Sequence, residues 1–403
     1  MRTTYQRRGT GFSRSRRFGT PNTRTKNYNY EWSETDLIKS IEYSKKAVAS
    51  NEAPMFIPVN SFDSFDIHPQ IKRNIKTKRF EVPSPVQDTA IPNILAGRDV
   101  IGIANTGTGK TAAYLIPLIH KACKDRRQKI LVIVPTRELA EQIHNDFRDL
   151  SLGIGINSAV LIGGAGVGGQ IYQLRRNPDF VVATPGRLKD MINRRLLDLS
   201  EFNNVVLDET DRMVDIGFLD VIKQFISMLP VQRQSLFFSA TISKKVQEII
   251  AAFVKDPVVI DVKKSSAAVS IKQDIVSVDK RQNKIDALHN LLIKDGFSKV
   301  IVFGNTKRSV QRLSDELVDR GFKADAIHGD KRQSQRHSIL NKFKREEIRI
   351  LLATDVAARG LDISNVSHVI NYELPKTYDD YVHRIGRTGR ADKTGVALTF
   401  VNQ

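Results

Sequence analysis

Short apolar runs rich in β-branched residues alternate with longer amphipathic stretches from about residue 99 onward. The runs have the length of buried strands, and the expected strands are residues 100–104, 130–134, 159–162, 180–183, 205–208, 235–238 and 258–262. Between them, apolar residues recur at helical spacing, as at 137–150, 217–229 and 244–253. Strands separated by helices predict right-handed crossovers and a parallel sheet covered on both faces.

A polar segment of small residues at 263–272 interrupts this pattern and is typical of a linker. A second alternating series follows, and its expected strands are residues 300–303, 324–327, 350–353, 368–372 and 396–401. The predicted fold class is therefore α/β, with two tandem parallel-sheet domains at 36–262 and 276–403 around a linker at 263–275. A length of 403 residues fits, since one domain takes roughly 150 residues.

The composition is that of a globular protein, with 40% hydrophobic and 27% charged residues. No apolar run approaches the roughly 18 residues that a membrane span needs, so we expect no membrane association through a span. The single cysteine, Cys123, excludes an internal disulfide and favours a cytoplasmic location. A net charge of +19 favours a polyanionic partner such as nucleic acid or an acidic membrane, although a basic surface kept for solubility remains an alternative.

The N-terminal segment has a composition of its own. Its first thirty residues hold eight Lys and Arg residues, and no acidic residue precedes Glu31. Glycines at 9, 11 and 19 oppose a helix, so residues 1–35 are predicted to form a disordered basic arm. An arm that binds nucleic acid is favoured over an organelle transit peptide, because a transit peptide needs an amphipathic helix.

The loop after the first expected strand resembles a phosphate-binding loop, with the sequence ANTGTGKT at 104–111. Gly107 and Gly109 allow backbone N–H groups to converge on phosphate oxygens, and the following helix adds its positive N-terminal end. Lys110 is expected to reach the β- and γ-phosphates, and the Thr111 hydroxyl to ligate Mg²⁺. Ala104 replaces the first glycine of the strict motif, while the core of the motif is intact.

An acidic pair follows the strand expected at 205–208. Carboxyl ends of parallel strands meet at one edge of a sheet, so Asp208 and Glu209 are expected near the phosphate loop. Asp208 can hold Mg²⁺ through water, and Glu209 can orient and deprotonate an attacking water. Alone, such a pair is as often an exposed strand cap.

Together these residues and several further motifs resemble the DEAD-box RNA helicases of superfamily 2, from about Phe62 to Val401. The matching motifs are Phe62 with FEVPSPVQ at 80–87, PTREL at 135–139, GG at 163–164, TPGR at 184–187, DETD at 208–211, SAT at 239–241, QSQR at 333–336, TDVAARGLD at 354–362 and HRIGRTGR at 383–390. The resemblance implies two RecA-like domains of the P-loop NTPase type, with ATP and Mg²⁺ as cofactors.

The resemblance also implies roles for individual residues. The catalytic set is Lys110, Asp208, Glu209, Arg387 and Arg390, of which the two arginines would be fingers from the second domain. The nucleotide set adds Phe62, Phe80 and Gln87 around adenine, Thr106, Gly107, Thr108, Gly109 and Thr111 at the phosphates, and Asp362 at the ribose. The RNA-binding set is Pro135, Thr136, Arg137, Gly164, Thr184, Gly186, Arg187, Gln333, Arg336 and Thr354. Asp211, Ser239, Thr241 and His383 would couple hydrolysis to closure of the two domains.

Two local features qualify this picture. Thr377 and Asp380 form a capping-box pattern, which predicts a helix from about Tyr378 and leaves Arg387 and Arg390 on a turn. Thr210 stands in the acidic motif where the family usually has alanine, but both mechanistic acids are present, so activity is still expected.

The implied function is RNA-stimulated ATP hydrolysis coupled to domain closure, gripping of single-stranded RNA and local duplex opening. The expected partner is RNA, bound through its backbone without sequence preference, and the expected state is a monomer. An ATP-gated RNA clamp or chaperone with little productive unwinding is an alternative, which the intact Glu209, Arg387 and Arg390 disfavour. A DNA translocase on the same frame is another, which Phe62, Gln87 and the acidic motif disfavour.

Overall fold

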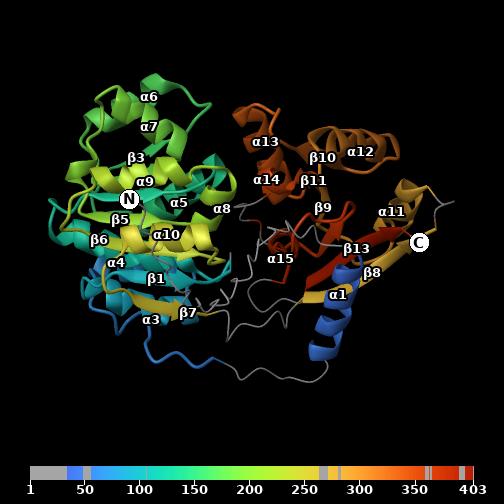
Figure 1. The fold of residues 1–403 in the computed structure, drawn as a ribbon, viewed down its shortest axis with the longest axis horizontal. Helices are drawn as coiled ribbons and strands as arrows, with labels where there is room; N and C mark the ends of the chain where they lie inside the picture. Colours follow the sequence, from blue (N-terminus) through green and yellow to red (C-terminus); the bar gives the residue numbers. More distant parts are fainter. Residues whose placement is uncertain are drawn as a thin grey trace, which may run out of the picture. The chain divides into compact units, whose positions relative to one another are not determined.

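The computed structural model describes residues 34–48, 56–105, 107–262, 271–279, 283–358, 363, 365–389 and 395–402. Within these ranges the chain forms two wholly parallel sheets, which confirms the predicted α/β fold class (Figure 1). The predicted basic arm up to Ser33 and the linker residues 263–270 lie outside the described residues.

The first sheet has seven strands in the order β3-β4-β2-β5-β6-β1-β7. They are β1 (Val100–Ile103), β2 (Ile130–Ile133), β3 (Ser158–Leu161), β4 (Phe180–Ala183), β5 (Asn204–Leu207), β6 (Gln234–Ser239) and β7 (Val258–Asp261). This order places β5, β6 and β1 side by side, in register at Val206, Leu236 and Val100. The loops that follow these three strands therefore open at one edge of the sheet.

Helices cover both faces of the first sheet because its strands are apolar on both sides. The helices are α2 (Pro69–Thr77), α3 (Pro85–Leu95), α4 (Lys110–Lys124), α5 (Arg137–Leu150), α6 (Val167–Arg175), α7 (Pro185–Asn193), α8 (Thr210–Asp215), α9 (Leu219–Met228) and α10 (Lys244–Phe253), with a 3₁₀ turn at Leu199–Glu201. Alternation along β2 sends Val132 to one core cluster and Leu131 to the other. Because a layer of helices packs on each face of the sheet, the connecting loops lie at the edges where the strands end.

The second sheet has six strands in the order β10-β11-β9-β12-β13-β8. They are β8 (Ile271–Val278), β9 (Val300–Gly304), β10 (Ala324–Ile327), β11 (Ile350–Thr354), β12 (His368–Asn371) and β13 (Gly395–Asn402). The accompanying helices are α11 (Lys284–Leu292), α12 (Lys307–Asp319), α13 (Gln333–Lys344), α14 (Asp355–Ala358) and α15 (Tyr378–Ile385). As predicted, α15 begins at Tyr378, where the Thr377 hydroxyl accepts a hydrogen bond from the backbone N–H of Asp380 at 3.1 Å.

The edge strand β8 corrects the sequence analysis, which assigned residues up to 275 to the linker. β8 begins at Ile271 and pairs with β13 along its whole length. Only Ile271, Gln273 and Val278 of this strand are buried, because one side of an edge strand faces solvent. That partial burial explains why the segment looked too polar to be a strand. The second sheet therefore begins before the predicted limit at 276, while the other predicted domain limits remain predictions.

The first described helix, α1 (Glu34–Val48), packs against the second sheet although it precedes the first sheet in sequence. Leu37 and Ile41 are buried among Ile271 of β8 and Tyr381 and Ile385 of α15. Figure 1 shows α1, in blue, beside β8 and β13. Residues 49–55 and 263–270 therefore both lie between segments that belong to different sheets.

Candidate nucleotide and RNA site

The phosphate-binding loop lies between β1 and α4, as its sequence predicts. Gly107 and Gly109 have φ values of 85° and 91°, a region that side chains rarely occupy. A Cβ atom on Gly109 would also lie 2.4 Å from the Gln87 amide nitrogen, so glycine is required there. Lys110 is buried, and its Nζ donates to the Ala104 carbonyl at 2.9 Å, which holds the ammonium group within the loop.

The acidic pair stands at the end of β5. Asp208 is only 2% exposed; its carboxylate accepts from the Tyr114 hydroxyl at 3.1 Å and from the backbone N–H of Glu209 at 2.8 Å. Burial raises the pKa of the Asp208 carboxyl to about 6, against the opposing effect of the nearby Lys110. Glu209 has a φ of 49° and is also buried. The left-handed backbone turns the chain sharply from strand to helix at the point where the acids are needed.

These donors fit Mg²⁺. The raised pKa of Asp208 reports a buried carboxylate without enough positive charge around it, and a divalent cation would supply that charge. Among the described residues, no group of three or more His, Cys, Asp and Glu side chains could hold a metal. Mg²⁺ bound to a nucleotide needs only one or two protein oxygens, because water and phosphate supply the rest.

Asp211 is tied to the loop after β6, as predicted for the coupling residues. Its Oδ2 accepts from the backbone N–H of Thr241 at 2.8 Å and from the Thr241 hydroxyl at 2.9 Å, while Ser239 Oγ accepts from the Asp211 N–H at 3.3 Å. Burial raises the pKa of the Asp211 carboxyl, but His383, Lys110 and these hydrogen bonds outweigh burial and hold it below its usual value.

The residues expected around adenine gather beside the loop. Phe62 and Phe80 stack with ring centroids 6.3 Å apart, but Phe62 is buried in the core while Phe80 is partly exposed. Gln87 accepts from the Ser84 N–H at 3.0 Å and donates to the Gly109 carbonyl at 3.1 Å. Among the described residues these bonds use one amide N–H and one lone pair of Gln87, so a second N–H and a second lone pair could meet a base.

Two side chains of the second sheet's α15 region lie at the same place. They are His383 and Arg387, and the small cavity that they line is completed by Lys110, Glu209, Asp211, Arg212 and Ala240 of the first sheet. Arg387 is 3% exposed and lies on the turn after α15, as predicted. Three predicted nucleotide residues, Thr106, Asp362 and Arg390, lie outside the described residues.

The predicted RNA-binding residues of the first sheet line the ends of β2, β3 and β4. The Arg137 guanidinium sits over Gly164, where an added Cβ would lie 2.1 Å from it, and Arg187 donates to the Ala165 carbonyl at 3.4 Å. Thr136 caps α5 by accepting from the Leu139 N–H. Pro135 and Thr184 are buried, whereas Gly164 and Gly186 are exposed.

The RNA-binding residues predicted in the second sheet have an unexpected partner. Arg336 of α13 forms an ion pair with Glu138 of α5 at 2.8 Å, and Gln333 donates to the same carboxylate at 3.4 Å. Thr354, at the end of β11, is 9% exposed. The contacts of these residues with RNA remain a prediction.

Sequence reasoning missed three charged residues. Arg384 is 1% exposed and forms an ion pair with Asp355, with Nε to Oδ1 at 2.6 Å. Arg212 and Glu138 reach residues of the opposite sheet. A signal existed for Arg384 and Glu138, which lie inside recognised motifs, whereas nothing in the chain marks Arg212.

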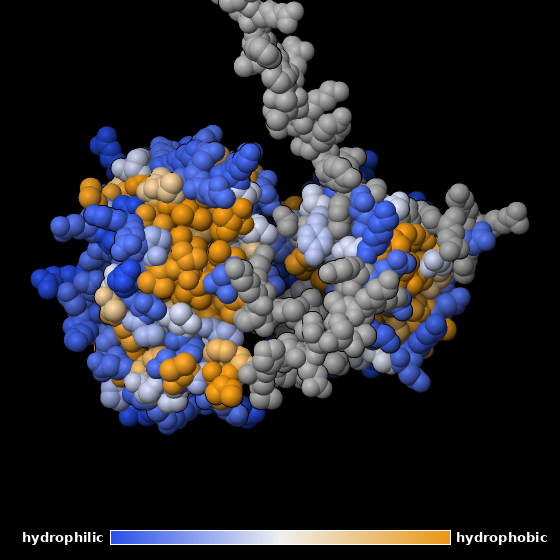
Figure 2. Space-filling view, turned by 60° about the horizontal axis from the view of Figure 1, so that its bottom comes forward, coloured by the Kyte–Doolittle hydropathy of each residue, from blue (hydrophilic) through white to orange (hydrophobic). Residues whose placement is uncertain are grey.

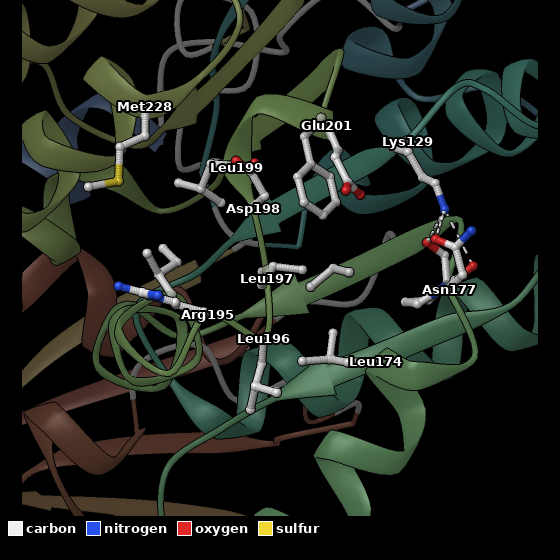
Figure 3. Close-up of a pocket in the computed structure, with 14 residues that line it drawn as sticks. Lys129, Leu174, Asn177, Arg195, Leu196, Leu197, Asp198, Leu199, Glu201 and Met228 are labelled. Atoms are coloured by element: carbon white, nitrogen blue, oxygen red, sulfur yellow. Dashed lines mark hydrogen bonds between the residues drawn. The ribbon is translucent and has the colours of Figure 1, made fainter.

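A cavity of about 580 Å³ lies at the opposite edge of the first sheet (Figure 3). It is lined by residues that precede β2, β4 and β5, and mostly by apolar side chains such as Leu196 and Leu197. At its rim Lys129 donates to Asn177 Oδ1 at 2.6 Å. This cavity lies away from the nucleotide site, which is found at the other ends of the strands. The volume of a cavity therefore does not identify the nucleotide site in this protein.

The face drawn in Figure 2 carries hydrophobic patches within a largely hydrophilic surface. Among the exposed large hydrophobic residues are Ile57, Val59 and Val82, which flank the adenine residues in sequence. None of the helices in the described ranges has both the length and the hydrophobicity needed to cross a membrane.

Comparisons with known proteins agree with this geometry. Residues 84–249 match the DEAD/DEAH box helicase family model, and residues 283–392 match the helicase conserved C-terminal domain. The ATP-dependent RNA helicase CshA of Listeria monocytogenes is 45% identical over 345 residues, which cover 85% of this chain and 66% of CshA. The chain thus spans slightly less than two thirds of that relative.

Solved structures are similar as well. A DEAD box protein from Methanococcus jannaschii is 36% identical, with 86% of this chain and 94% of that chain covered and a TM-score of 0.53. Dbp5 of Saccharomyces cerevisiae bound to RNA and ADP BeF3 is 29% identical, with 85% and 90% covered and a TM-score of 0.77.

Proposed function

Because the chain belongs to the DEAD-box family of ATP-dependent RNA helicases, we propose that it hydrolyses ATP at the edge of the first sheet and uses the cycle to grip and locally open RNA. One observation carries the proposal. Lys110, Glu209 and Asp211 of the first sheet and His383 and Arg387 of the second line a single cavity. Because the site needs residues of both sheets, hydrolysis can depend on whether the two sheets have come together.

In the proposed reaction each residue acts on a stated group. The loop amides at 107–109 and the Lys110 ammonium would bind phosphate oxygens, and Thr111 and Asp208 would hold Mg²⁺. When bound, Mg²⁺ neutralises charge that develops on the phosphates. Glu209 accepts a proton from the attacking water, and Arg387 stabilises negative charge on the phosphoryl oxygens. Arg390 and the ribose contact of Asp362 belong to the same proposal.

RNA would bind along the loops that hold Arg137, Gly164 and Arg187 on the first sheet and Arg336 and Thr354 on the second. Cationic side chains and glycine N–H groups suit phosphate and 2′-hydroxyl contacts, which carry no base preference. For Arg336 the Glu138 ion pair would tie the two halves of the groove together. We further propose a cytoplasmic monomer of two domains, the second of which includes α1 and the residues from 271 onward.

Replacement of the proposed base tests the reaction. Glu209→Gln should still bind ATP and RNA, since the metal ligand Asp208 and Lys110 remain, but should lose turnover. ATPase rates with and without RNA, together with titration of a fluorescent nucleotide, measure both properties. Lost nucleotide binding in this variant would contradict the role of a base.

Replacement of the second-sheet arginine tests the shared site. Arg387→Ala should reduce RNA-stimulated hydrolysis by about 10³-fold, the usual contribution of an arginine finger. Nucleotide binding should survive, because Lys110 and the loop amides that are assigned to the phosphates are unchanged. Arg345→Ala, an exposed arginine of the same sheet, serves as the matched control. Near-normal turnover of Arg387→Ala would refute the shared site.

Base choice tests the adenine residues. The Gln87 amide N–H can donate to N7 of adenine while its oxygen accepts from the N6 amino group. Guanine has the acceptor O6 in place of that donor, so the Gln87 oxygen would face another oxygen. ATP should therefore be preferred over GTP, and Gln87→Ala should reduce the preference. Equal turnover of ATP and GTP by the unchanged protein would refute this assignment.

A further inference from the structure

Arg212 is a buried arginine that connects the catalytic acid to the second sheet. It lies in α8, three residues after Glu209, and its side chain is 2% exposed. One guanidinium nitrogen, Nη2, donates to the backbone carbonyl of Val356 in α14. The other, Nη1, lies 3.9 Å from Glu209 Oε2.

The cost of burying a guanidinium makes this arrangement informative. A buried cation is tolerated only where charge and hydrogen-bond partners compensate for the lost water. For Arg212, charge compensation comes from the Glu209 carboxylate, which follows β5 of the first sheet. A hydrogen-bond acceptor comes from the Val356 carbonyl in α14, beside the second sheet. A guanidinium is planar and rigid, so fixing one nitrogen fixes the direction of the other.

We propose that Arg212 is a positioning residue that orients the Glu209 carboxylate when its Nη2 engages the Val356 carbonyl. The proposal rests on the proposed function, in which Glu209 is the base. It adds a direct link from the backbone of α14 to that base, through an arginine that lines the same cavity as Arg387. Approach of the second sheet then supplies one catalytic group and aligns another.

If Arg212 acts by orienting Glu209, its replacement should change the kinetics in a way that a simple loss of packing would not. Arg212→Gln should lower kcat with saturating RNA by about tenfold or more, since small misplacements of a reacting group have effects of this size. KM for ATP should change less than about threefold, because Lys110 and the loop amides, which are assigned to the phosphates, remain unchanged. Arg212→Lys, which keeps the charge but loses the rigid fork, should recover part of the loss.

A double-mutant cycle with Glu209→Gln identifies the group through which Arg212 acts. If Arg212 acts through the Glu209 carboxylate, Arg212→Gln should cause no further loss in the Glu209→Gln protein under single-turnover conditions. The proposal would be overturned if the double variant were slower than Glu209→Gln by the same factor that Arg212→Gln causes alone. A normal kcat of Arg212→Gln would also overturn it. Lys223→Gln in α9, whose ion pair with Glu248 is exposed, is the control.

The outcomes separate this proposal from the proposed function. An unchanged protein that fails to hydrolyse ATP refutes the function itself. Hydrolysis that is lost in Glu209→Gln but normal in Arg212→Gln refutes only the positioning role. Thermal unfolding and fluorescent-nucleotide titration of each variant identify misfolding, and in that case Arg212→Lys, which retains the buried charge, carries the test.

Discussion

Single side chains at the nucleotide edge differ in how well their polar atoms are satisfied. Asp211 accepts hydrogen bonds from the Thr241 backbone and hydroxyl, and Asp208 accepts two more. Thr210, between them, is fully buried, and its hydroxyl has no hydrogen-bond partner among the described residues. A buried hydroxyl without a partner costs about 1–3 kcal/mol.

Thr210 therefore offers a stabilising substitution next to the catalytic acids. Thr210→Val keeps the shape, removes the unsatisfied hydroxyl and should raise the free energy of unfolding by about 1 kcal/mol. Urea unfolding monitors this change, with Thr210→Ser, which retains the hydroxyl, as the control. A less stable Thr210→Val protein would show that the hydroxyl is satisfied. Thr210→Ala should alter ATPase activity by less than roughly tenfold.

Asp208 should make stability depend on pH in a predictable direction. Its folded pKa of about 6 exceeds the usual value of 3.8, so the folded state binds the proton more tightly. The resulting penalty is absent well below pH 4, grows as pH rises, and levels off above pH 6 at about 3 kcal/mol. Without nucleotide and Mg²⁺, Asp208→Asn should be the more stable protein, and its advantage should grow by about 1 kcal/mol from pH 5 to pH 7. An advantage independent of pH in thermal unfolding would contradict this.

Sequence motifs identified the residues that touch the reaction better than those that support them. Lys110, Asp208 and Asp211 follow strands whose order makes them neighbours, and short motifs predicted that. Thr210 was noticed as a departure, but its missing hydrogen bond depends on which atoms surround it. Arg212 was missed, because only packing against α14 distinguishes it from a surface arginine.

At the level of elements, one ion pair fixes α15 to α14. Arg384 donates to Asp355 Oδ1 and Oδ2 at 2.6 and 2.8 Å, to Asn305 Oδ1 at 2.9 Å and to the Glu373 carbonyl at 2.6 Å. It thereby holds the helix that carries His383 and leads to Arg387. The pair supports the position of the predicted finger rather than the chemistry.

Loss of this pair should destabilise the protein strongly. Arg384→Met leaves the partly buried Asp355 without its cation and removes the other hydrogen bonds of the buried guanidinium, and should cost about 3 kcal/mol. Thermal unfolding measures the loss, and nucleotide binding at the first sheet should be retained. Arg312→Met, which breaks an exposed pair with Glu316, should cost less than about 0.5 kcal/mol. Equal stability of the two variants would refute the assigned role of Arg384.

Elements with strong periodicity were predicted almost to the residue, as at α5 and α10. The failures were elements whose burial depends on distant segments. β8 is half exposed, and its partner β13 lies more than 100 residues away. The segment before the first sheet shows a further limit, because nothing local indicates that Leu37 packs on the second sheet.

At the level of the whole molecule, positive charge is concentrated at the N-terminus. The net charge is +19, and the first thirty residues supply eight positive charges with five aromatic residues among them. Charge interleaved with aromatic residues suits single-stranded RNA, since bases stack on rings while cations meet phosphates. The segment before residue 34 lies outside the described residues, so this role rests on sequence.

Salt dependence tests the arm. Each phosphate neutralised on a single strand steepens the plot of log K against log salt by about 0.7. Deleting residues 1–30 should weaken RNA binding and flatten that slope, while ATPase at saturating RNA changes little. A passive tail would give superimposable slopes, and lost ATPase at saturating RNA would place the arm in the catalytic fold.

The packing of α1 changes how the chain should be divided. Ile41, before the first sheet, and Ile271, after it, meet in one cluster with Tyr381 and Ile385. The first sheet is thus an insertion whose two ends return to the same place on a single host, made of α1 and residues from 271 onward. A chain beginning at residue 271 would lack part of its own core. Cleavage between 263 and 270 would leave two fragments that still share it.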